Sequence, residues 1–543
     1  MAIDVSADRG RFVAEVEAVM KSRLEAVARP RNALAVALFS TAITFPSGTS
    51  FALQRQSEQT KQPEPPPSRE SKAPAEPPLP EPAPSAAPAE KSAEILIKPP
   101  QPKAGPKYLN LRYDEDFSYL DGEPDSYNSD IFDPIKNIHL GPDWRLSLGG
   151  EFRFQMESET NKAFGSTEPA NDTFQLYRFL MHTDVKYRKL FRVFVQGVEA
   201  FDEDRDLAPR PTDENQWDLH QLFFDLRFLG EEFPWTLRVG RQELNYGNQR
   251  LLSPLEWANV RRRFDGVKVF AKTEKWDADF FYMKPIPVQP EQFDDHDEEF
   301  DFYGIYTTYK GIPRHGIDGY FFAVDNTADP RNPNGRAGDK STYTLGTRFW
   351  GKTAGFDYET EVAGQWGHWA GDTVQAWAVA LDGGYTFDHS AKPRLGAGFD
   401  WATGDKDPTD TRVQTFDQLF PLGHKYFGYL DLVGRQNVIG PNVNFSVWPV
   451  AEKVQAAAAW HYFWLAEERD ALYNAGGAAT RRDATGRSGK EIGNELDLTV
   501  LWKIDPRSSL LVGWSHLWDA DFIQQTGPSE NADLFYVQYA FKF

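Results

Sequence analysis

The stretch WRLSLGGEFRFQM, at Trp144–Met156, decides the fold because its side chains alternate between two kinds of face. Apolar side chains recur at every second position, and charged or polar side chains fill most positions between them. Since successive side chains of a strand point to opposite faces, this spacing predicts a β-strand with one apolar and one polar face.

The same two-faced pattern recurs about 18 times between residues 144 and 543, with almost no helical periodicity. Clear examples are Tyr177–Tyr187, Leu222–Phe228, Trp235–Gln242, Thr342–Trp350, Phe356–Trp366, Val454–Trp464 and Asn494–Lys503. Two architectures fit such a series. A soluble sandwich or propeller hides the apolar faces in a core, whereas a membrane barrel turns them towards lipid and keeps the polar faces around a watery lumen.

The connections between the strands favour the barrel. Long polar connections, such as Leu244–Arg263 and Gly404–Pro441, alternate with tight turns, such as Thr273–Lys275, Gly351–Thr353 and Asp505–Arg507. Outer-membrane barrels have long loops at the extracellular end and short turns at the periplasmic end. We therefore predict an all-β protein, a closed antiparallel transmembrane β-barrel of about 18 strands in the bacterial outer membrane.

The final stretch, LFYVQYAFKF, supports the same fold. Phe535, Val537, Tyr539, Phe541 and Phe543 fall on one face, and the sequence ends on an aromatic residue. An edge strand of a soluble sheet rarely finishes on an exposed aromatic residue, because exposed apolar edges promote aggregation. The stretch resembles the terminal-strand signal by which barrel proteins are recognised for membrane insertion.

Composition excludes several classes of function. The 543 residues carry a net charge of −21, which argues against a general nucleic-acid binder. The absence of cysteine excludes disulfide frameworks, thiolate-ligated clusters and cysteine nucleophiles. The sequence has no G-x-S-x-G, H-E-x-x-H or phosphate-binding glycine loop, so we expect neither an enzyme nor a bound cofactor or metal.

The amino-terminal residues predict export from the cytoplasm. Residues 1–52 end in a short apolar run, Asn32–Phe45, which follows Arg29 and Arg31 and precedes a small-residue exit at Ala52, as in a secretory signal peptide. Translation from Met20 gives that signal a conventional length. Residues 53–106 are rich in proline, alanine and glutamate, which predicts a disordered periplasmic spacer. Residues 107–143 then lead into the barrel at 144–543.

The polar face of the predicted strands carries many basic side chains. Arginine presents a planar fork that matches a carboxylate, so a constriction rimmed by arginine favours carboxylated or phosphorylated solutes. Acidic side chains such as Glu151, Asp225, Glu359 and Glu361 interleave with the basic ones. The alternative for each single arginine is that it pairs with an acidic side chain on a neighbouring strand. Such a pair stiffens the wall and does not contact a solute.

Several motifs resemble the alginate export family of outer-membrane barrels over roughly residues 110 to 543. The motifs are LSLGGEFRF at Leu146–Phe154, LRVGRQELNYGNQRLL at Leu237–Leu252, RRRFDGVKV at Arg261–Val269, TFDQLFPLGHKYFGYLDL at Thr415–Leu432 and RYDEDFSYL at Arg112–Leu120. The resemblance implies an 18-stranded barrel that exports an anionic, alginate-like polysaccharide passively through an Arg-lined constriction. The partners it implies are the polymer, the lipid of the outer membrane and a periplasmic export complex.

Motif positions and strand parity together give a set of candidate substrate-path residues. They are Arg153, Arg178, Arg238, Arg241, Arg250, Arg262, Arg263, Lys268, Arg348 and Arg394. Arg241 has the parity of the lipid face, so we expect it to pair locally, with Asp265 as the candidate. For Arg250 and Arg261–Arg263, an ion-pair network that folds a loop is as good an interpretation as contact with a ligand. His424 lies in the GHKYFG block.

A gate has three candidate locations. The turn at Asp505–Arg507 is too short to fill a pore, so a gate must come from the 404–441 loop, the 244–263 loop or the segment 107–140. We expect a monomer, because one closed sheet needs no partner to satisfy its backbone.

Three alternatives to polysaccharide export remain at this point. A general porin that takes up small anions or oligosaccharides has the same sequence features. A glycan hydrolase needs two carboxylates at a fixed separation, and Glu359 and Glu361 share a face. A surface adhesin would conduct no ions. The acidic loops Phe293–Phe302 and Asp405–Asp410 are expected to be solvated surface rather than calcium sites.

Overall fold

The computed structural model describes residues 105–228 and 234–543. The expected signal peptide, and the expected spacer up to residue 104, lie outside the described residues. Among the described residues, no helix combines the length and apolar character that a membrane crossing requires.

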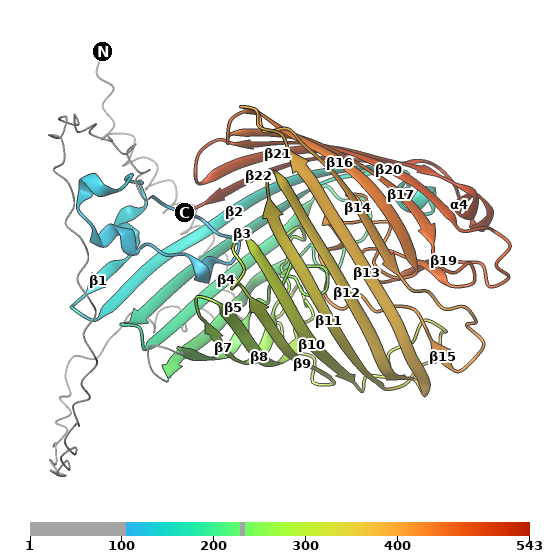
Figure 1. Ribbon diagram of the computed structural model, residues 1–543, viewed down its shortest axis with the longest axis horizontal. Helices are drawn as coiled ribbons and strands as arrows, with labels where there is room; N and C mark the ends of the chain where they lie inside the picture. Colours follow the sequence, from blue (N-terminus) through green and yellow to red (C-terminus); the bar gives the residue numbers. More distant parts are fainter. Residues whose placement is uncertain (1–104, 229–233) are drawn as a thin grey trace, which may run out of the picture. The chain divides into compact units, whose positions relative to one another are not determined.

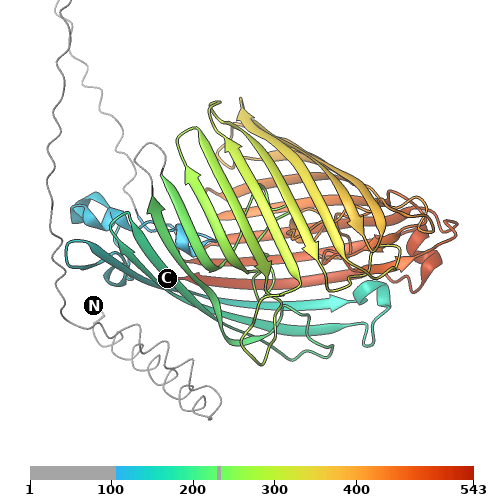
Figure 2. The same ribbon diagram turned by 90° about the horizontal axis from the view of Figure 1, so that it is seen from below.

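Eighteen antiparallel strands form one closed barrel, because the first of them pairs with the last. The barrel strands are β2 (Trp144–Thr160), β3 (Asp172–Tyr187), β4 (Phe191–Glu203), β5 (Asn215–Phe228), β6 (Trp235–Gln242), β7 (Phe264–Lys272), β8 (Trp276–Pro285), β9 (Phe300–Tyr309), β10 (His315–Asn326), β11 (Lys340–Thr353), β12 (Phe356–Trp369), β13 (Asp372–Thr386), β14 (Arg394–Ala402), β16 (Val438–Val450), β17 (Val454–Leu465), β20 (Glu491–Lys503), β21 (Ser508–Asp519) and β22 (Ala532–Lys542). Each strand pairs with its neighbours in chain order, as Figures 1 and 2 show. The predicted fold is confirmed.

Short elements occupy the lead-in segment and the loops. The lead-in segment contains the 3₁₀ turns η1 (Arg112–Asp114), η2 (Ser118–Asp121), η3 (Pro124–Ser126) and η4 (Asp133–Ile135), and then β1 (Ile138–Leu140), which pairs with β2. The loops contain α3 (Lys162–Gly165), β15 (Arg412–Val413), η5 (Gly423–Lys425), β18 (Ala471–Tyr473), β19 (Ala479–Arg482) and α4 (Asp521–Thr526).

The outer face of the barrel is apolar and its inner face is largely polar. On β3, the exposed Phe179 and Met181 alternate with the buried Arg178 and His182. The same alternation holds around the barrel, where exposed aromatic and aliphatic side chains face outwards between buried polar ones. A membrane barrel requires an apolar outside and a polar inside, the reverse of a soluble protein, because its outer surface contacts acyl chains instead of water.

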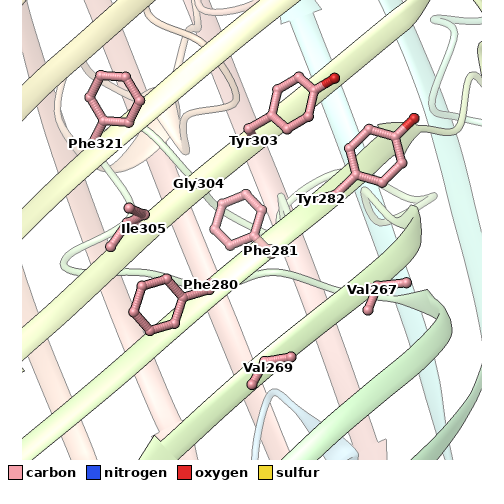
Figure 3. A pocket seen from close by; sticks show the side chains of 9 residues that line it. All are labelled: Val267, Val269, Phe280, Phe281, Tyr282, Tyr303, Gly304, Ile305 and Phe321. Carbon is pink, nitrogen blue, oxygen red and sulfur yellow. The ribbon is translucent and has the colours of Figure 1, made fainter.

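A shallow apolar groove interrupts the outer face between β7 and β10. Its volume is about 400 Å³, and Figure 3 shows Phe280, Ile305 and Phe321 among the side chains that line it. Gly304 lies at its centre, where a side chain would collide with the ring of Phe281. The groove is a feature of the lipid-facing surface and does not belong to the lumen.

The two ends of the barrel differ as the sequence predicts. Tight turns such as Thr273–Lys275 lie at the end that also holds the lead-in segment and the carboxyl terminus, and the long loops lie at the other end with α4 (Figure 1). One predicted turn is misplaced, because β11 continues through Thr353 and the turn is formed by Ala354 and Gly355. Both turn residues have positive φ, as a tight two-residue hairpin requires.

Part of the inner face is aromatic, which the sequence analysis did not anticipate. Phe302, Phe322 and Tyr320 point inwards from β9 and β10 and pack against Phe416 and Phe420 of the loop 403–437. Because this loop folds into the barrel, the wall beneath it is shielded from water and is lined by apolar side chains. An inward-facing position in the period-2 pattern is therefore polar where it meets water and apolar where a loop covers it.

Candidate permeation pathway

The loop between β6 and β7, residues 243–263 and here called L3, crosses the interior of the barrel. At one side, Arg153 of β2 donates hydrogen bonds to the backbone oxygens of Glu256 and Trp257, at 2.9 and 2.8 Å. Arg178 of β3 donates to the same loop, at 2.9 Å to the backbone oxygen of Ala258. Each of these guanidinium groups is buried, and each ties the loop to the wall.

At its other side, L3 is anchored on β12. Arg250 forms ion pairs with Glu359 and with Glu361, the latter at 3.3 Å. Asn248 donates a further hydrogen bond of 3.1 Å to Glu359. Since β2 and β12 lie on opposite sides of the closed sheet, L3 spans the lumen from wall to wall.

A second loop, residues 403–437 between β14 and β16 and here called L7, lies beside L3 inside the barrel. The backbone of Phe420 is bonded to that of Leu251 and Ser253, each at 2.9 Å. The rings of His424 in L7 and Trp257 in L3 stack with their centroids 3.9 Å apart. The two loops therefore form one continuous barrier.

The far side of L7 rests on the wall close to the barrel seam. The backbone amide of Leu430 donates to Glu495 of β20 at 3.0 Å, and the ring of Tyr429 stacks on Tyr536 of β22. Any solute that passes through the barrel must therefore pass L3 and L7. Two of the three loop regions predicted to carry a gate thus meet at this level.

Most of the candidate substrate-path residues are paired with carboxylates. The pairs are Arg178–Glu151, Arg238–Asp225, Arg241–Asp265, Arg250 with Glu359 and Glu361, Arg263 with Asp218 and Asp294, Lys268–Asp279, Arg348 with Asp318 and Glu359, and Arg394–Asp357. Several are bidentate, as in Arg238, whose nitrogens lie 2.7 and 2.9 Å from the two oxygens of Asp225. Contact of these side chains with a solute stays a prediction.

The remaining two candidates, Arg153 and Arg262, bond to neutral oxygens. Arg262 donates only to backbone oxygens, among them those of Ser253 and Phe420, and so ties L3 to L7. Burial without an acidic partner lowers the pKa of Arg262 to about 10. Both arginines therefore position loops.

Arg241 pairs with Asp265, as its position in the alternating pattern of the strand predicts. It lies opposite Asp265 in the β6–β7 register, and its nitrogens are 3.0 Å from both carboxylate oxygens. It also donates to the backbone oxygen of Asp294 in the loop 286–299, at 2.9 Å. The guanidinium group is therefore satisfied locally at the end of the strand.

One cation at the junction of L3 and L7 was missed by the sequence analysis. Lys425, in η5 of L7, has an exposed side chain whose ammonium group donates to Asn248 of L3. Among the described residues, no carboxylate oxygen lies within 4.0 Å of this ammonium nitrogen, the limit for an ion pair. Desolvation, reinforced by Arg250 and Arg348 and opposed by Asp382, lowers the pKa of Lys425 to about 8.

An exposed but partly desolvated ammonium group is what a narrow water-filled passage produces. The signal for this residue was present in the sequence, because Lys425 lies in the same GHKYFG block that drew attention to His424. His424 itself faces Asp431, with 3.2 Å between Nδ1 and Oδ2, and stacks on Trp257. The lysine, and not the histidine, therefore presents a charge to the passage.

The two carboxylates considered for hydrolysis are both engaged. Glu359 accepts from Arg250, Arg348 and Asn248, and Glu361 accepts from Arg250 and from the hydroxyl of Tyr320 at 2.9 Å. A glycosidase needs one carboxyl group that holds a proton for the leaving group. Glu359 and Glu361 are both bonded to partners within the protein, which leaves neither of them available to a sugar.

Asp295 and His296 of the loop 286–299 form a cluster with Asp265 of β7. Oxygen and nitrogen atoms of Asp265, Asp295 and His296 lie within 4.8 Å of one another. Asp265 is already bound to Arg241, and calcium prefers a shell made of oxygens only. The cluster therefore does not fit calcium, the ion considered for this acidic loop.

Comparison with known proteins places the barrel among outer-membrane channels. A family model described as alginate export matches residues 144–537. Among solved structures, OccD3 (OpdP) of Pseudomonas aeruginosa has a TM-score of 0.50 at 12% identity, covering 73% of this chain and 91% of that one. OccAB1 of Acinetobacter baumannii has the same score and identity, covering 73% and 96%. No curated protein matches the sequence.

The structural likeness, at such low identity, concerns the fold alone. The family match covers most of the chain and coincides with the barrel strands from β2 into β22. The fold, the family and the apolar outer face agree on a bacterial outer-membrane channel. The chain belongs to the alginate export family.

Proposed function

We propose that this channel exports an anionic polysaccharide, of the alginate type, by passive permeation through its charged lumen. The observation that carries the proposal is the exposed ammonium group of Lys425, which donates to Asn248 where L3 and L7 meet. A carboxylate of the polymer is the natural partner for an exposed cation that pairs with no carboxylate among residues 105–228 and 234–543.

The ion-paired arginines suit a mobile polymer better than free ones. A free guanidinium group in a narrow lumen would bind a uronate tightly, and conduction requires binding that is weak enough to release the solute. In the pair of Arg394 with Asp357 the guanidinium side chain is partly exposed, so a passing carboxylate can replace the wall carboxylate and then leave. The path therefore offers exchangeable contacts.

The direction of transport follows from the gradient, because a barrel contains no motor. Export requires synthesis of the polymer on the periplasmic side, and we propose that a periplasmic partner delivers it. Uptake of small anions is the second candidate, since the same exposed cation favours it equally. The two differ in the size of the solute that passes.

The experiment is a current measurement on the purified channel in a planar bilayer. Under a potassium chloride gradient, the reversal potential should indicate preference for chloride, and polyuronate should block the current at concentrations at which a neutral dextran of equal length does not. Cation preference, or equal block by both polymers, would overturn the proposal. Oligouronates that pass while long chains only block would favour the uptake porin.

A hydrolase is tested in the same preparation. The proposed channel releases no new reducing ends from polyuronate, and Glu359→Gln does not change that result. Turnover that disappears in Glu359→Gln would assign the protein to the enzymes.

A further inference from the structure

The segment that precedes the barrel, residues 107–137 and here called the plug segment, lies at the periplasmic end of the barrel, and part of it enters the mouth. Figure 1 shows it beside the start of β2, near the carboxyl terminus. Lys136 donates to the backbone oxygen of Leu148 on β2 at 2.5 Å, and its ammonium group lies 4.7 Å from the ring centroid of Phe117. The segment is thus attached to the first barrel strand.

The seam of the barrel supplies the first anchor. The guanidinium group of Arg112 donates to the backbone oxygens of Gly150 on β2 and Phe543 beyond β22, at 2.5 and 2.8 Å. Glu115 of the same segment pairs with Arg112 at 2.6 Å, and both side chains are buried. The arginine therefore holds both edges of the seam and one end of the plug segment.

Tyr113 supplies the second anchor, deeper in the lumen. Its ring is 6% exposed and meets Phe223 edge-on with 5.3 Å between the ring centroids. Phe223 alternates with the exposed, lipid-facing Phe224, so it belongs to the inner face of β5. The hydroxyl of Tyr113 donates to the backbone oxygen of Glu243, in L3, at 3.1 Å.

Charged groups of the inner wall hold the same tyrosine. The guanidinium carbon of Arg238 lies 4.4 Å from the ring centroid, and Arg192 donates to the backbone oxygen of Tyr113 at 2.6 Å. Both arginines are also paired with wall carboxylates, Asp225 and Asp184. The plug segment thus occupies the positions that a solute entering from the periplasm would reach first.

The plug segment also reaches the loop barrier. The side-chain amide of Asn110 donates to Glu256 of L3, and Lys542 of β22 donates to Asn110 at 3.2 Å. Further hydrogen bonds that join the segment to the barrel come from the side chains of Arg112, Tyr113, Lys136 and Arg192. These bonds can release without breaking the barrel sheet.

We infer that the plug segment is a removable gate, which closes the periplasmic mouth at rest and withdraws as a unit when the channel conducts. The hairpin of β1 with β2 fixes its downstream end, so withdrawal is a swing about that hairpin. Withdrawal uncovers the pairs Arg238–Asp225 and Arg192–Asp184 to the solute. The inference rests on the fold and holds whatever the solute is.

The first test locks the gate in place. Because the sequence contains no cysteine, Asn110→Cys and Glu256→Cys can be joined by a short bis-methanethiosulfonate reagent without side reactions. The cross-linked full-length channel should carry severalfold less potassium chloride current than either single-cysteine variant treated alike. A reductant, which cleaves the link, should restore the current. Equal currents before and after cross-linking would overturn the inference.

The second test loosens the gate. Arg112→Ala combined with Tyr113→Ala should raise the open fraction of single channels severalfold, whereas Lys310→Ala, at a residue that follows β9 and pairs with Asp277 of β8, should not change it. Heat-modifiable migration of each variant in electrophoresis checks that the barrel has formed. A folded double variant with wild-type gating would contradict the inference. Neither test involves polysaccharide, so each outcome is independent of the proposed substrate.

Discussion

Arg238 and Tyr113 form a cation–π pair that joins the inner wall of the barrel to the segment in front of it, with 4.4 Å between the guanidinium carbon and the ring centroid. The same guanidinium group is held by both oxygens of Asp225. An arginine predicted to meet the solute is thus occupied on two sides by the protein itself. Access to it is a matter of gating as well as of charge.

Arg238→Glu should weaken block by polyuronate from the periplasmic side, because it replaces a cation by a second anion beside Asp225. The substitution also loosens Tyr113, so the measurement belongs in a background that already carries Tyr113→Ala. Unchanged block in that background would remove Arg238 from the solute path, and a change only in the wild-type background would assign its effect to the gate.

The preference for anions should fall as the pH rises from 7 to 9.5. The pKa of Lys425, lowered to about 8, leaves the side chain mostly protonated at pH 7 and neutral at pH 9.5. Reversal potentials at both pH values measure this. Lys425→Arg should abolish the pH dependence and Lys425→Gln should behave at pH 7 like the wild type at pH 9.5.

The matched control for this measurement is Lys406→Gln, which removes an exposed cation from the same loop. It should leave the reversal potential and its pH dependence unchanged. An equal effect of both glutamine variants would mean that the net charge of L7, rather than the position of Lys425, sets the preference.

Arg263→Ala should destabilise the barrel strongly. The side chain of Arg263 is fully buried between Asp218 and Asp294, and its removal leaves two carboxylates without a counter-charge. Breaking a buried pair in this way costs about 3–5 kcal/mol. Urea unfolding in lipid vesicles measures the loss, and Arg412→Ala, on an exposed pair with Asp410, should change the free energy of unfolding by less than about 1 kcal/mol.

Arg153→Ala should increase the fluctuations of the single-channel current. The residue donates three hydrogen bonds to L3 and none to a carboxylate, so its loss frees the loop without leaving a buried acid unpaired. We expect larger fluctuations in single-channel current and faster amide exchange over residues 254–260. Arg145→Ala, on the same strand and bonded only to its own turn, should show neither effect.

The fold was predictable because lipid imposes one rule on every strand. Each must present an apolar face outwards, and a period of two reveals that face without knowledge of the neighbours. The inner face obeys no such rule. Phe302 and Phe322 share the parity of charged residues elsewhere, and only the folding of L7 into the barrel explains them.

The candidate site was predictable in part. Parity and motifs located the arginines, and local register explains pairs such as Arg241–Asp265. The partners of Arg153 are about a hundred residues away in the sequence, and no local pattern encodes that distance. Lys425 was missed for a related reason. The alternation of a strand shows which way a side chain points, but the direction of a lysine on a loop depends on how that loop packs against another one.

The bonds from Arg112 to Gly150 and Phe543 have a consequence for assembly. One acceptor lies on the first barrel strand and the other follows the last, so the binding place of Arg112 is complete only after the two edges have met. A nascent barrel still open at its seam cannot seat the arginine. Closure of the seam must therefore come before this arginine docks, so the amino-terminal segment takes its place last.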